Sequence, residues 1–188
     1  AIVLLKKHFK TCGPLCIQNF SSILQYRLLT IQSPEELSSY FDIDGFLANR
    51  IFQNRFAFSS ISDFTERLTS KNQTRGHIQR ALFHILLNLS EPEGSAMFLP
   101  QYTRILGMKR SSSGILKCMK NSSSIPVLTK MADAFKVIDV STLSEDQKKA
   151  ALCQLDQTTL SSHIYESVLS QKYKQIFRHE NTRQIVIL

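Results

Sequence analysis

A regular apolar pattern after Thr74 constrains the fold of this 188-residue chain more than any other feature. Thr74 stands where a side-chain oxygen accepts a hydrogen bond from the first turn of a helix. Apolar residues then recur at spacings of three and four: Ile78, Leu82, Ile85, Leu86 and Leu89. Because such spacings place side chains on one face, the pattern predicts an amphipathic helix that buries that face in a core.

Shorter helices are predicted before Thr74. Residues 19–31 carry apolar residues in a near-helical pattern, and residues 33–36 (Ser-Pro-Glu-Glu) form a capping box with proline at the first helical position. Asp44 caps the next helix, in which Phe46, Leu47, Ile51 and Phe52 are expected to face inward, and Ser60 caps another. Short capped helices without a regular repeat length predict a helical bundle or array.

The character of the sequence changes after Pro100. Residues 102–108 and 125–128 have the composition of short strands, and a helical pattern lies between them at residues 111–120. Strand, helix and strand in this order favour parallel pairing with a crossover connection. The apolar residues 185–188 predict a late strand of the same small sheet.

Two further helices are predicted before that last strand. Ser144 caps the first, and Asp156 caps the second. The expected fold class is therefore α+β and predominantly α. A helical bundle or array is followed by a small, mostly parallel sheet with flanking helices. Its strands are expected near residues 102–108, 125–129 and 184–188.

The domain organisation follows from these elements. We expect a helical region over residues 1–100 and a small α/β region over residues 101–188 that packs on it, together forming one compact unit. The sequence starts without an initiator Met, inside what reads as structured sequence. The chain is therefore interpreted as a fragment of a longer protein.

The charge of the chain favours an anionic polymer as partner. The formal net charge is +8, from 23 Lys and Arg against 15 Asp and Glu. Basic side chains that neutralise phosphates release counterions, which drives nucleic-acid binding. We therefore predict RNA binding, and the candidate residues are Arg27, Arg75, His77, Arg80, Arg104, Lys109, Arg110, Lys117 and Lys130.

Two settings make these candidates specific. His77, Arg80 and His84 share one helix face at spacings of three and four, which suits phosphates or the edge of a nucleotide. Lys109 and Arg110 lie in a basic loop that leads to a helix N-terminus, where a phosphate oxygen is favoured. Alternatives remain open, because the first set also fits a solvated helix face. Arg27 equally fits a side chain with a buried stem.

No catalytic, cofactor-binding or metal-binding residue is assigned. Motifs of triad hydrolases, zinc proteases and dinucleotide-binding enzymes do not occur in the sequence. Cysteines occur at positions 12, 16, 118 and 153 without zinc-site spacing, which indicates reduced thiols. No apolar run reaches membrane-spanning length, so we expect a cytoplasmic protein without a membrane partner.

Several segments, in their order along the chain, resemble the C-terminal region of a bacterial family, the tRNA(Met) cytidine acetate ligases, which are nucleotidyltransferase-like. The segments span nearly the whole chain. They are residues 20–29, Arg75-x-x-Ile78-Gln79-Arg80, Tyr102-x-Arg104-Ile105-Leu106-Gly107, residues 125–130 and residues 185–188.

The resemblance implies an ATP-dependent ligase that forms acetyl-adenylate and acetylates N4 of the wobble cytidine in elongator tRNA(Met). In this family ATP binds an N-terminal domain that carries HxGH and Ser-x-x-Ile-Arg motifs, and neither motif occurs in this sequence. The resemblance therefore implies that ATP and acetate bind outside this chain and that tRNA is its partner. It also implies that the chain alone is inactive. A helical protein-interaction module without a catalytic role is the alternative. A complete enzyme would need an unrecognised site.

Overall fold

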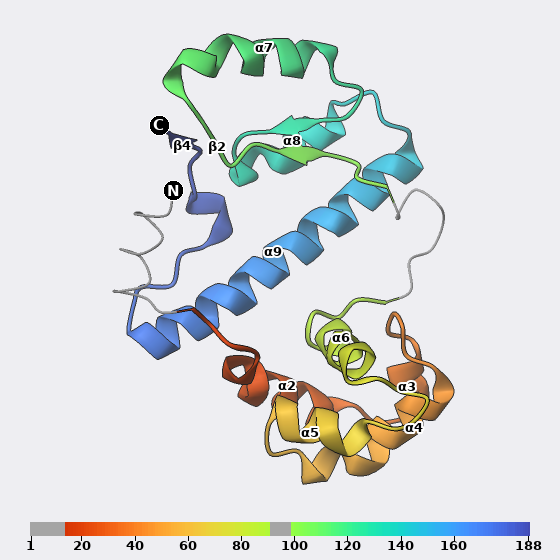
Figure 1. Cartoon of the computed structure of the whole chain (residues 1–188). Coiled ribbons are helices and arrows are strands. Elements are labelled where there is room, and N and C mark those ends of the chain that lie inside the picture. Colours follow the sequence, from red (N-terminus) through yellow and green to blue (C-terminus); the bar gives the residue numbers. More distant parts are fainter. Residues whose placement is uncertain (1–13, 91–98) are drawn as a thin grey trace. The chain divides into compact units, whose positions relative to one another are not determined.

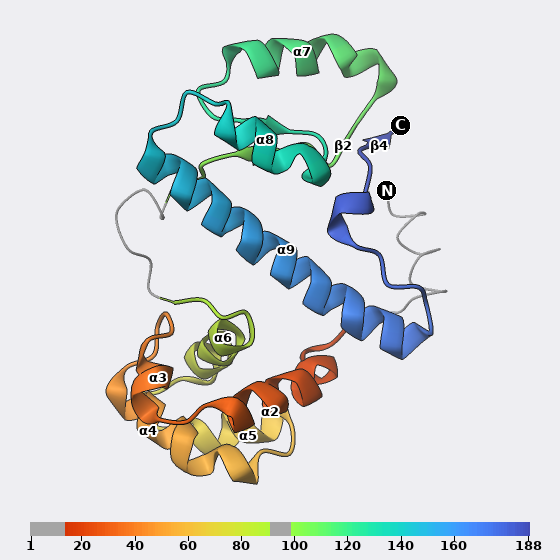
Figure 2. The same cartoon turned by 180° about the vertical axis from the view of Figure 1, so that it is seen from behind.

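The computed structural model describes residues 14–90 and 99–188, and the chain divides into two compact units. The helical unit comprises Ala1–Glu91 and Ser167–Gln175, and the mixed unit comprises Pro92–Glu166 and Ile176–Leu188 (Figures 1 and 2). Each unit has its own hydrophobic core. The end of the longest helix belongs to the helical unit, whereas the expected division into residues 1–100 and 101–188 stays a prediction.

The helical unit is built from short helices. Their bounds are η1 (Ile17–Phe20), α2 (Ser21–Thr30), α3 (Pro34–Ser38), α4 (Gly45–Asn54), η2 (Arg55–Ala57), α5 (Ile61–Leu68) and α6 (Arg75–Leu86). Four of them begin as predicted, with a side-chain oxygen accepting a backbone N–H three residues later. Donor and acceptor are 2.7–3.3 Å apart, and the caps are Ser33, Asp44, Ser60 and Thr74.

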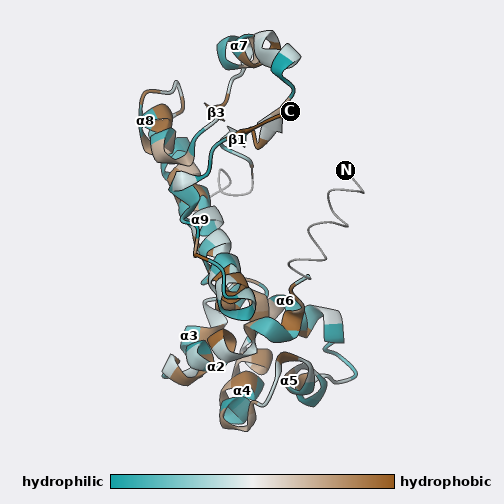
Figure 3. Ribbon diagram, turned by 90° about the vertical axis from the view of Figure 1, so that its left-hand side faces the viewer, coloured by the Kyte–Doolittle hydropathy of each residue, from teal (hydrophilic) through white to brown (hydrophobic). Residues whose placement is uncertain are grey.

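The core of the helical unit lies between α2, α4, α5 and α6. Its completely enclosed side chains include Leu47, Ile51, Ile61, Leu68, Ile78, Leu82 and Ile85. The predicted inner face of α6 is therefore confirmed. Figure 3 shows that these helices carry hydrophobic as well as hydrophilic residues, as amphipathic elements do.

Two details of the helical unit differ from expectation. Phe46 is 63% exposed, so its predicted inward direction is wrong. Leu47 and Ile51, four residues apart, are buried on the inner face of α4 as predicted, whereas Phe46 lies beside the Arg50 guanidinium. Glu36 accepts a hydrogen bond from the Gln32 backbone N–H at 3.0 Å, one residue before the expected capping-box partner.

The mixed unit contains short strands and helices. Their bounds are β1 (Thr103–Arg104), β2 (Gly107–Met108), η4 (Arg110–Ser112), α7 (Ser113–Ser122), β3 (Val127–Leu128), η5 (Met131–Asp133), α8 (Ala134–Asp139), η6 (Glu180–Thr182) and β4 (Val186–Ile187). The core of this unit contains Leu128, Met131, Ala134, Ile138, Leu143, Ala151 and Leu155.

The strands pair in parallel, as predicted, but as two separate pairs rather than one sheet. β1 pairs with β3, so the predicted strand–helix–strand unit around α7 is confirmed, and β2 pairs with β4. The partner changes between β1 and β2. Ile105 donates its backbone N–H to Leu128, whereas the next carbonyl, that of Leu106, accepts from Val186. This switch of partner explains why a single sheet does not form.

One helix, α9 (Glu145–Tyr173), replaces the two that were predicted. Its start is confirmed, because Ser144 and Gln147 form a reciprocal capping box at 3.0 and 3.3 Å. The predicted break at Asp156 is wrong. No glycine or proline occurs between Glu145 and Tyr173, so nothing ends the helix and Asp156 lies exposed in its middle. Across the two stretches that the structure describes, no helix is both long and apolar enough to span a bilayer.

Ser60 and Asp63 at the start of α5 provide a test of the helical unit. The pKa of the Asp63 carboxyl lies below its ordinary value because the hydroxyls of Ser60 and, second, Ser59 donate hydrogen bonds to it. Ser60→Ala should therefore raise this pKa, as measured by an NMR titration. Because the folded pKa is the lower one, the carboxylate stabilises the fold above the unfolded pKa. This contribution disappears as the pH falls through the folded pKa.

Ser59→Ala is the matched control for this titration. It removes the second donor without removing the helix cap, so the pKa of Asp63 should rise less than in Ser60→Ala. An unchanged Asp63 pKa in Ser60→Ala would contradict the assignment.

Candidate nucleic-acid interface

The predicted phosphate-binding face of α6 contacts the loop before α4. Arg80 Nε donates to Asp42 Oδ2 at 2.6 Å, and His77 Nε2 lies 3.0 Å from the Asp42 carbonyl oxygen. His84 Nδ1 lies 2.7 Å from the carbonyl oxygen of Phe41. Asp42 has a φ of 65°, a left-handed conformation that a non-glycine residue adopts only with support. These three side chains therefore hold a turn of the helical unit.

Arg27 and Arg75 are also engaged. Arg27 Nη2 donates to Tyr40 Oη at 2.6 Å and to Asn88 Oδ1 at 2.5 Å. It therefore links α2 to the loop after α3 and to the loop after α6. This favours the structural alternative for Arg27. Arg75 Nη1 lies 3.6 Å from Glu66 Oε1, and both side chains are more than half exposed. An ion pair of this kind is weak, so Arg75 keeps much of its attraction for an anion.

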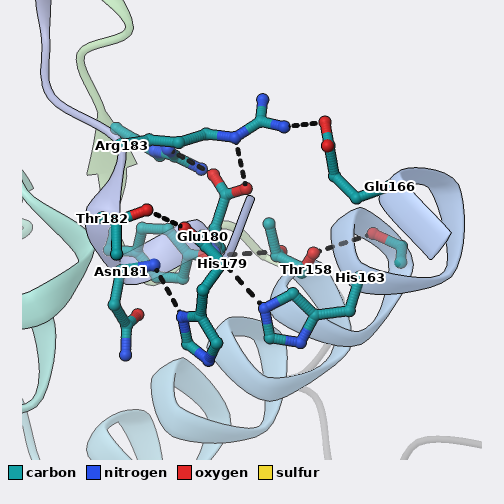
Figure 4. Close-up of polar contacts among 11 residues, drawn as sticks. Thr158, His163, Glu166, His179, Glu180, Asn181, Thr182 and Arg183 are labelled. Atoms are coloured by element: carbon teal, nitrogen blue, oxygen red, sulfur yellow. Dashed lines mark hydrogen bonds and ion pairs between the residues drawn. The ribbon is translucent and has the colours of Figure 1, made fainter. Parts of the chain in front are cut away.

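Arg104 faces the buried carboxylate of Glu180 in the mixed unit. Figure 4 shows this carboxylate together with its second partner, Arg183. Glu180 is 2% exposed, and its Oε1 lies 2.5 Å from Arg104 Nη2. Arg183 approaches the same carboxylate, with Nε 3.3 Å from Glu180 Oε2, and also pairs with Glu166 of α9. Two arginines thus neutralise two glutamates. The cluster leaves no surplus charge for a phosphate.

Two histidines with rings tilted by 56° to each other complete this cluster. His163 Nε2 accepts the backbone N–H of Glu180 at 3.3 Å, and His179 Nδ1 accepts that of Asn181 at 3.1 Å. Their ring centroids lie 4.4 Å apart. Because each of these nitrogens is an acceptor, each neutral ring carries its proton on the other nitrogen. The cluster therefore orders the segment that leads from α9 to β4.

The remaining predicted cations have no acidic partner in the described part of the chain, and all are exposed: Lys109, Arg110, Lys117 and Lys130. Lys120, which was not among the predicted residues, shares this property and only reaches the Thr129 hydroxyl, at 3.5 Å. We call these five the basic segment. A sequence signal for it was present, because no Asp or Glu occurs between Glu93 and Asp133.

The basic segment includes residues of a helix, α7, that buries no side chain, and residues on either side of it. α7 carries Lys117 and Lys120, and no residue of it is buried. It lies at the outer edge of the mixed unit, as Figures 1 and 2 both show. Lys109 and Arg110 precede it. The Arg110 N–H donates to the Leu188 carbonyl at 3.0 Å and the Ser112 N–H to that of Lys109. These two backbone N–H groups are therefore already bonded, whereas a phosphate site at the N-terminus of α7 stays a prediction.

The described residues contain no group of three or more His, Cys, Asp or Glu side chains arranged to hold a metal ion. Cys16, Cys118 and Cys153 are free thiols, and Cys12 lies outside the described residues.

The Glu180 cluster yields a prediction about stability. Glu180→Gln removes a buried charge and leaves Arg104 and Arg183 without it, so the mixed unit should lose about 3 kcal/mol in urea unfolding. Glu145→Gln is the control, since Glu145 is 90% exposed in its pair with Lys148 and should change stability by less than about 1 kcal/mol. Equal losses in the two variants would contradict a structural role for Glu180.

Comparison with known proteins places these features in a family context. A tRNA(Met) cytidine acetate ligase of Bacillus cereus (strain Q1) is 31% identical over 169 residues, which are 88% of this chain and 40% of the relative. One of Caldanaerobacter subterraneus subsp. tengcongensis is 30% identical over 143 residues, 76% of this chain and 35% of the relative. This chain thus spans less than half the length of either relative.

The fold has a solved counterpart. The crystal structure of Thermotoga maritima TmcAL bound with alpha-thio ATP superposes with a TM-score of 0.82 at 21% identity, covering 100% of this chain and 45% of that one. At this identity the likeness concerns the fold. The model of the HIGH Nucleotidyl Transferase family matches residues 1–180. A match over nearly the whole sequence shows that this chain belongs to the HIGH nucleotidyl transferase family.

Proposed function

We propose that this chain is the tRNA-binding, C-terminal portion of an ATP-dependent ligase. The ligase would acetylate the wobble cytidine of elongator tRNA(Met) to N4-acetylcytidine through acetyl-adenylate. The names of the relatives support the reaction. One structural observation carries the binding role: the five exposed cations of the basic segment lack an acidic partner among the described residues. The proposal makes the protein cytoplasmic, since its partner is tRNA.

The adenylation step is assigned to the rest of the longer protein. Neither HxGH nor Ser-x-x-Ile-Arg occurs in residues 1–188. ATP and acetate would accordingly bind outside this chain, and the chain would position tRNA for the reaction. The family match over residues 1–180 makes this assignment testable, because ATP turnover by the isolated chain would overturn it.

The chemistry of the basic segment suits the tRNA backbone. Lysine ammonium groups are flexible point charges that follow a row of phosphates without reading bases. The cations of α6 and of the Glu180 cluster are less suited, because Arg80 and Arg104 already neutralise Asp42 and Glu180. We therefore assign the strongest tRNA contacts to the basic segment. The helix face of His77 and Arg80 is assigned to the stability of the helical unit.

Charge reversal in the basic segment tests this proposal. In Lys117→Glu/Lys120→Glu, tRNA affinity should fall at least tenfold at low salt. The slope of log affinity against log salt should become shallower by roughly 1.5, since each lost phosphate contact removes about 0.7–0.9. Fluorescence polarisation with labelled tRNA(Met) at several salt concentrations measures both quantities.

The matched control carries the same change of charge in the helical unit. Arg67 and Lys71 have no acidic partner among the described residues, so Arg67→Glu/Lys71→Glu alters net charge equally. Its salt slope should stay near that of the unchanged chain. If both double variants weaken binding alike, net charge rather than the basic segment drives the interaction, and the proposed interface is wrong.

A protein-interaction module is the second candidate, because α7 exposes apolar side chains. Ile115 is 62% exposed and Met119 is 38% exposed, four residues apart on a helix that buries nothing. A ten-residue helix is marginal in water without a partner. No tRNA binding at low salt, together with a protein partner recovered through α7, would favour this candidate over the first.

A further inference from the structure

A groove between α8 and the start of α9 lies within the mixed unit and outside the basic segment. It encloses about 480 Å³, which is within the range of about 300–1,000 Å³ for small-molecule sites. Ile138 and Leu152 line its apolar part, and lysines lie on both sides, with Lys136 on α8 and Lys149 on α9. The groove thus combines an apolar surface with positive charge.

Phe135 lines this groove with an exposed aromatic ring. It is 61% exposed and makes no contact with another aromatic ring or a cation among the described residues. Some exposed rings of the chain are covered by cations, as Phe56 is by the Arg55 guanidinium at 4.3 Å, whereas Phe135 is not. An uncovered ring beside an apolar wall suits a planar ligand, and a nucleobase stacks on such a ring whatever its identity.

The charged groups around Phe135 fit the other parts of a nucleotide. Lys148 Nζ lies 3.1 Å from Glu145 Oε1, whereas Lys136 and Lys149 have no acidic partner in the described chain and remain free for phosphate oxygens. Asp139, also in the groove, has no hydrogen-bond donor among the described residues. Its carboxylate only accepts hydrogen bonds, so it suits a base that carries an exocyclic amine.

We infer that this groove binds one unpaired nucleotide of the RNA, with the base stacked on Phe135 and a phosphate held by Lys136 and Lys149. The inference rests on the proposed function, because it assigns a second contact of the same RNA. Unpaired bases are the parts of a folded RNA that proteins read, since their faces and edges are accessible. Asp139 makes the groove favour cytosine, adenine or guanine over uracil.

The test uses the whole chain and tRNA(Met), with Phe135→Leu as the variant. Leucine keeps an apolar side chain but cannot stack a base, so affinity should fall about tenfold. The salt slope should not change, because no charge is removed. Lys136→Gln/Lys149→Gln should instead make the slope shallower by roughly 0.7–1.5. Phe56→Leu is the control, because this ring is 74% exposed and lies in the helical unit. Thermal unfolding followed by circular dichroism checks that each variant is folded.

The base preference gives a second readout. Wild-type chain should bind oligo(C) more tightly than oligo(U) of the same length, and Asp139→Asn should reduce this difference. Equal binding of both oligomers by the wild-type chain would overturn the assignment of Asp139.

The outcomes separate the two proposals. If the wild-type chain binds tRNA and Phe135→Leu binds equally well, the groove assignment is wrong and the proposed function stands. If the wild-type chain does not bind tRNA at low salt, both are wrong. Saturable binding of CMP that depends on Phe135 but does not compete with tRNA would show a site for a free nucleotide, which also overturns the assignment to RNA.

Discussion

A buried carboxylate is the constraint on which the mixed unit depends. Glu180 is 2% exposed, and a charge in that position is tolerated only with cations and hydrogen-bond donors around it. Arg104 of β1 forms an ion pair with Glu180, and Arg183 forms ion pairs with both Glu180 and Glu166 of α9. These pairs order the residues before β4, which then pairs with β2. The Leu188 carbonyl of the same terminal segment accepts the Arg110 N–H. The C-terminus is therefore hydrogen-bonded to the loop that leads to α7.

The positive charges of the chain consequently fall into two classes. One class is used within the fold: Arg80 neutralises Asp42, which has a left-handed backbone, and Arg104 neutralises Glu180. The other class has no acidic partner in the described residues. It includes the basic segment, with five such cations between Lys109 and Lys130, as well as Arg67, Lys71, Lys136 and Lys149. A net charge of +8 does not distinguish these classes. Only the positions of the carboxylates do, and these positions direct the functional proposal to α7 and its flanks.

The sequence predicted what depends on local interactions. The four helix caps and the inner face of α6 were readable because each involves residues three or four apart. Features that depend on distant residues could not be predicted from the sequence. Asp42 contacts Arg80, 38 positions further along the chain. The strands form two pairs because the Leu106 carbonyl accepts the Val186 N–H. The break at Asp156 was predicted wrongly from a capping residue alone, although the stretch lacks glycine and proline. The acid-free stretch before Asp133 was a visible signal for the basic segment, including Lys120.

Hydrogen–deuterium exchange of the chain with and without tRNA(Met) tests the central claim most directly, because it compares the two classes of cations in one experiment. We predict slower exchange on tRNA binding in residues 107–130, above all in α7, because none of its residues is buried in the free chain. Residues 75–86 should exchange at an unchanged rate. Protection of α6 without protection of α7 would contradict the account.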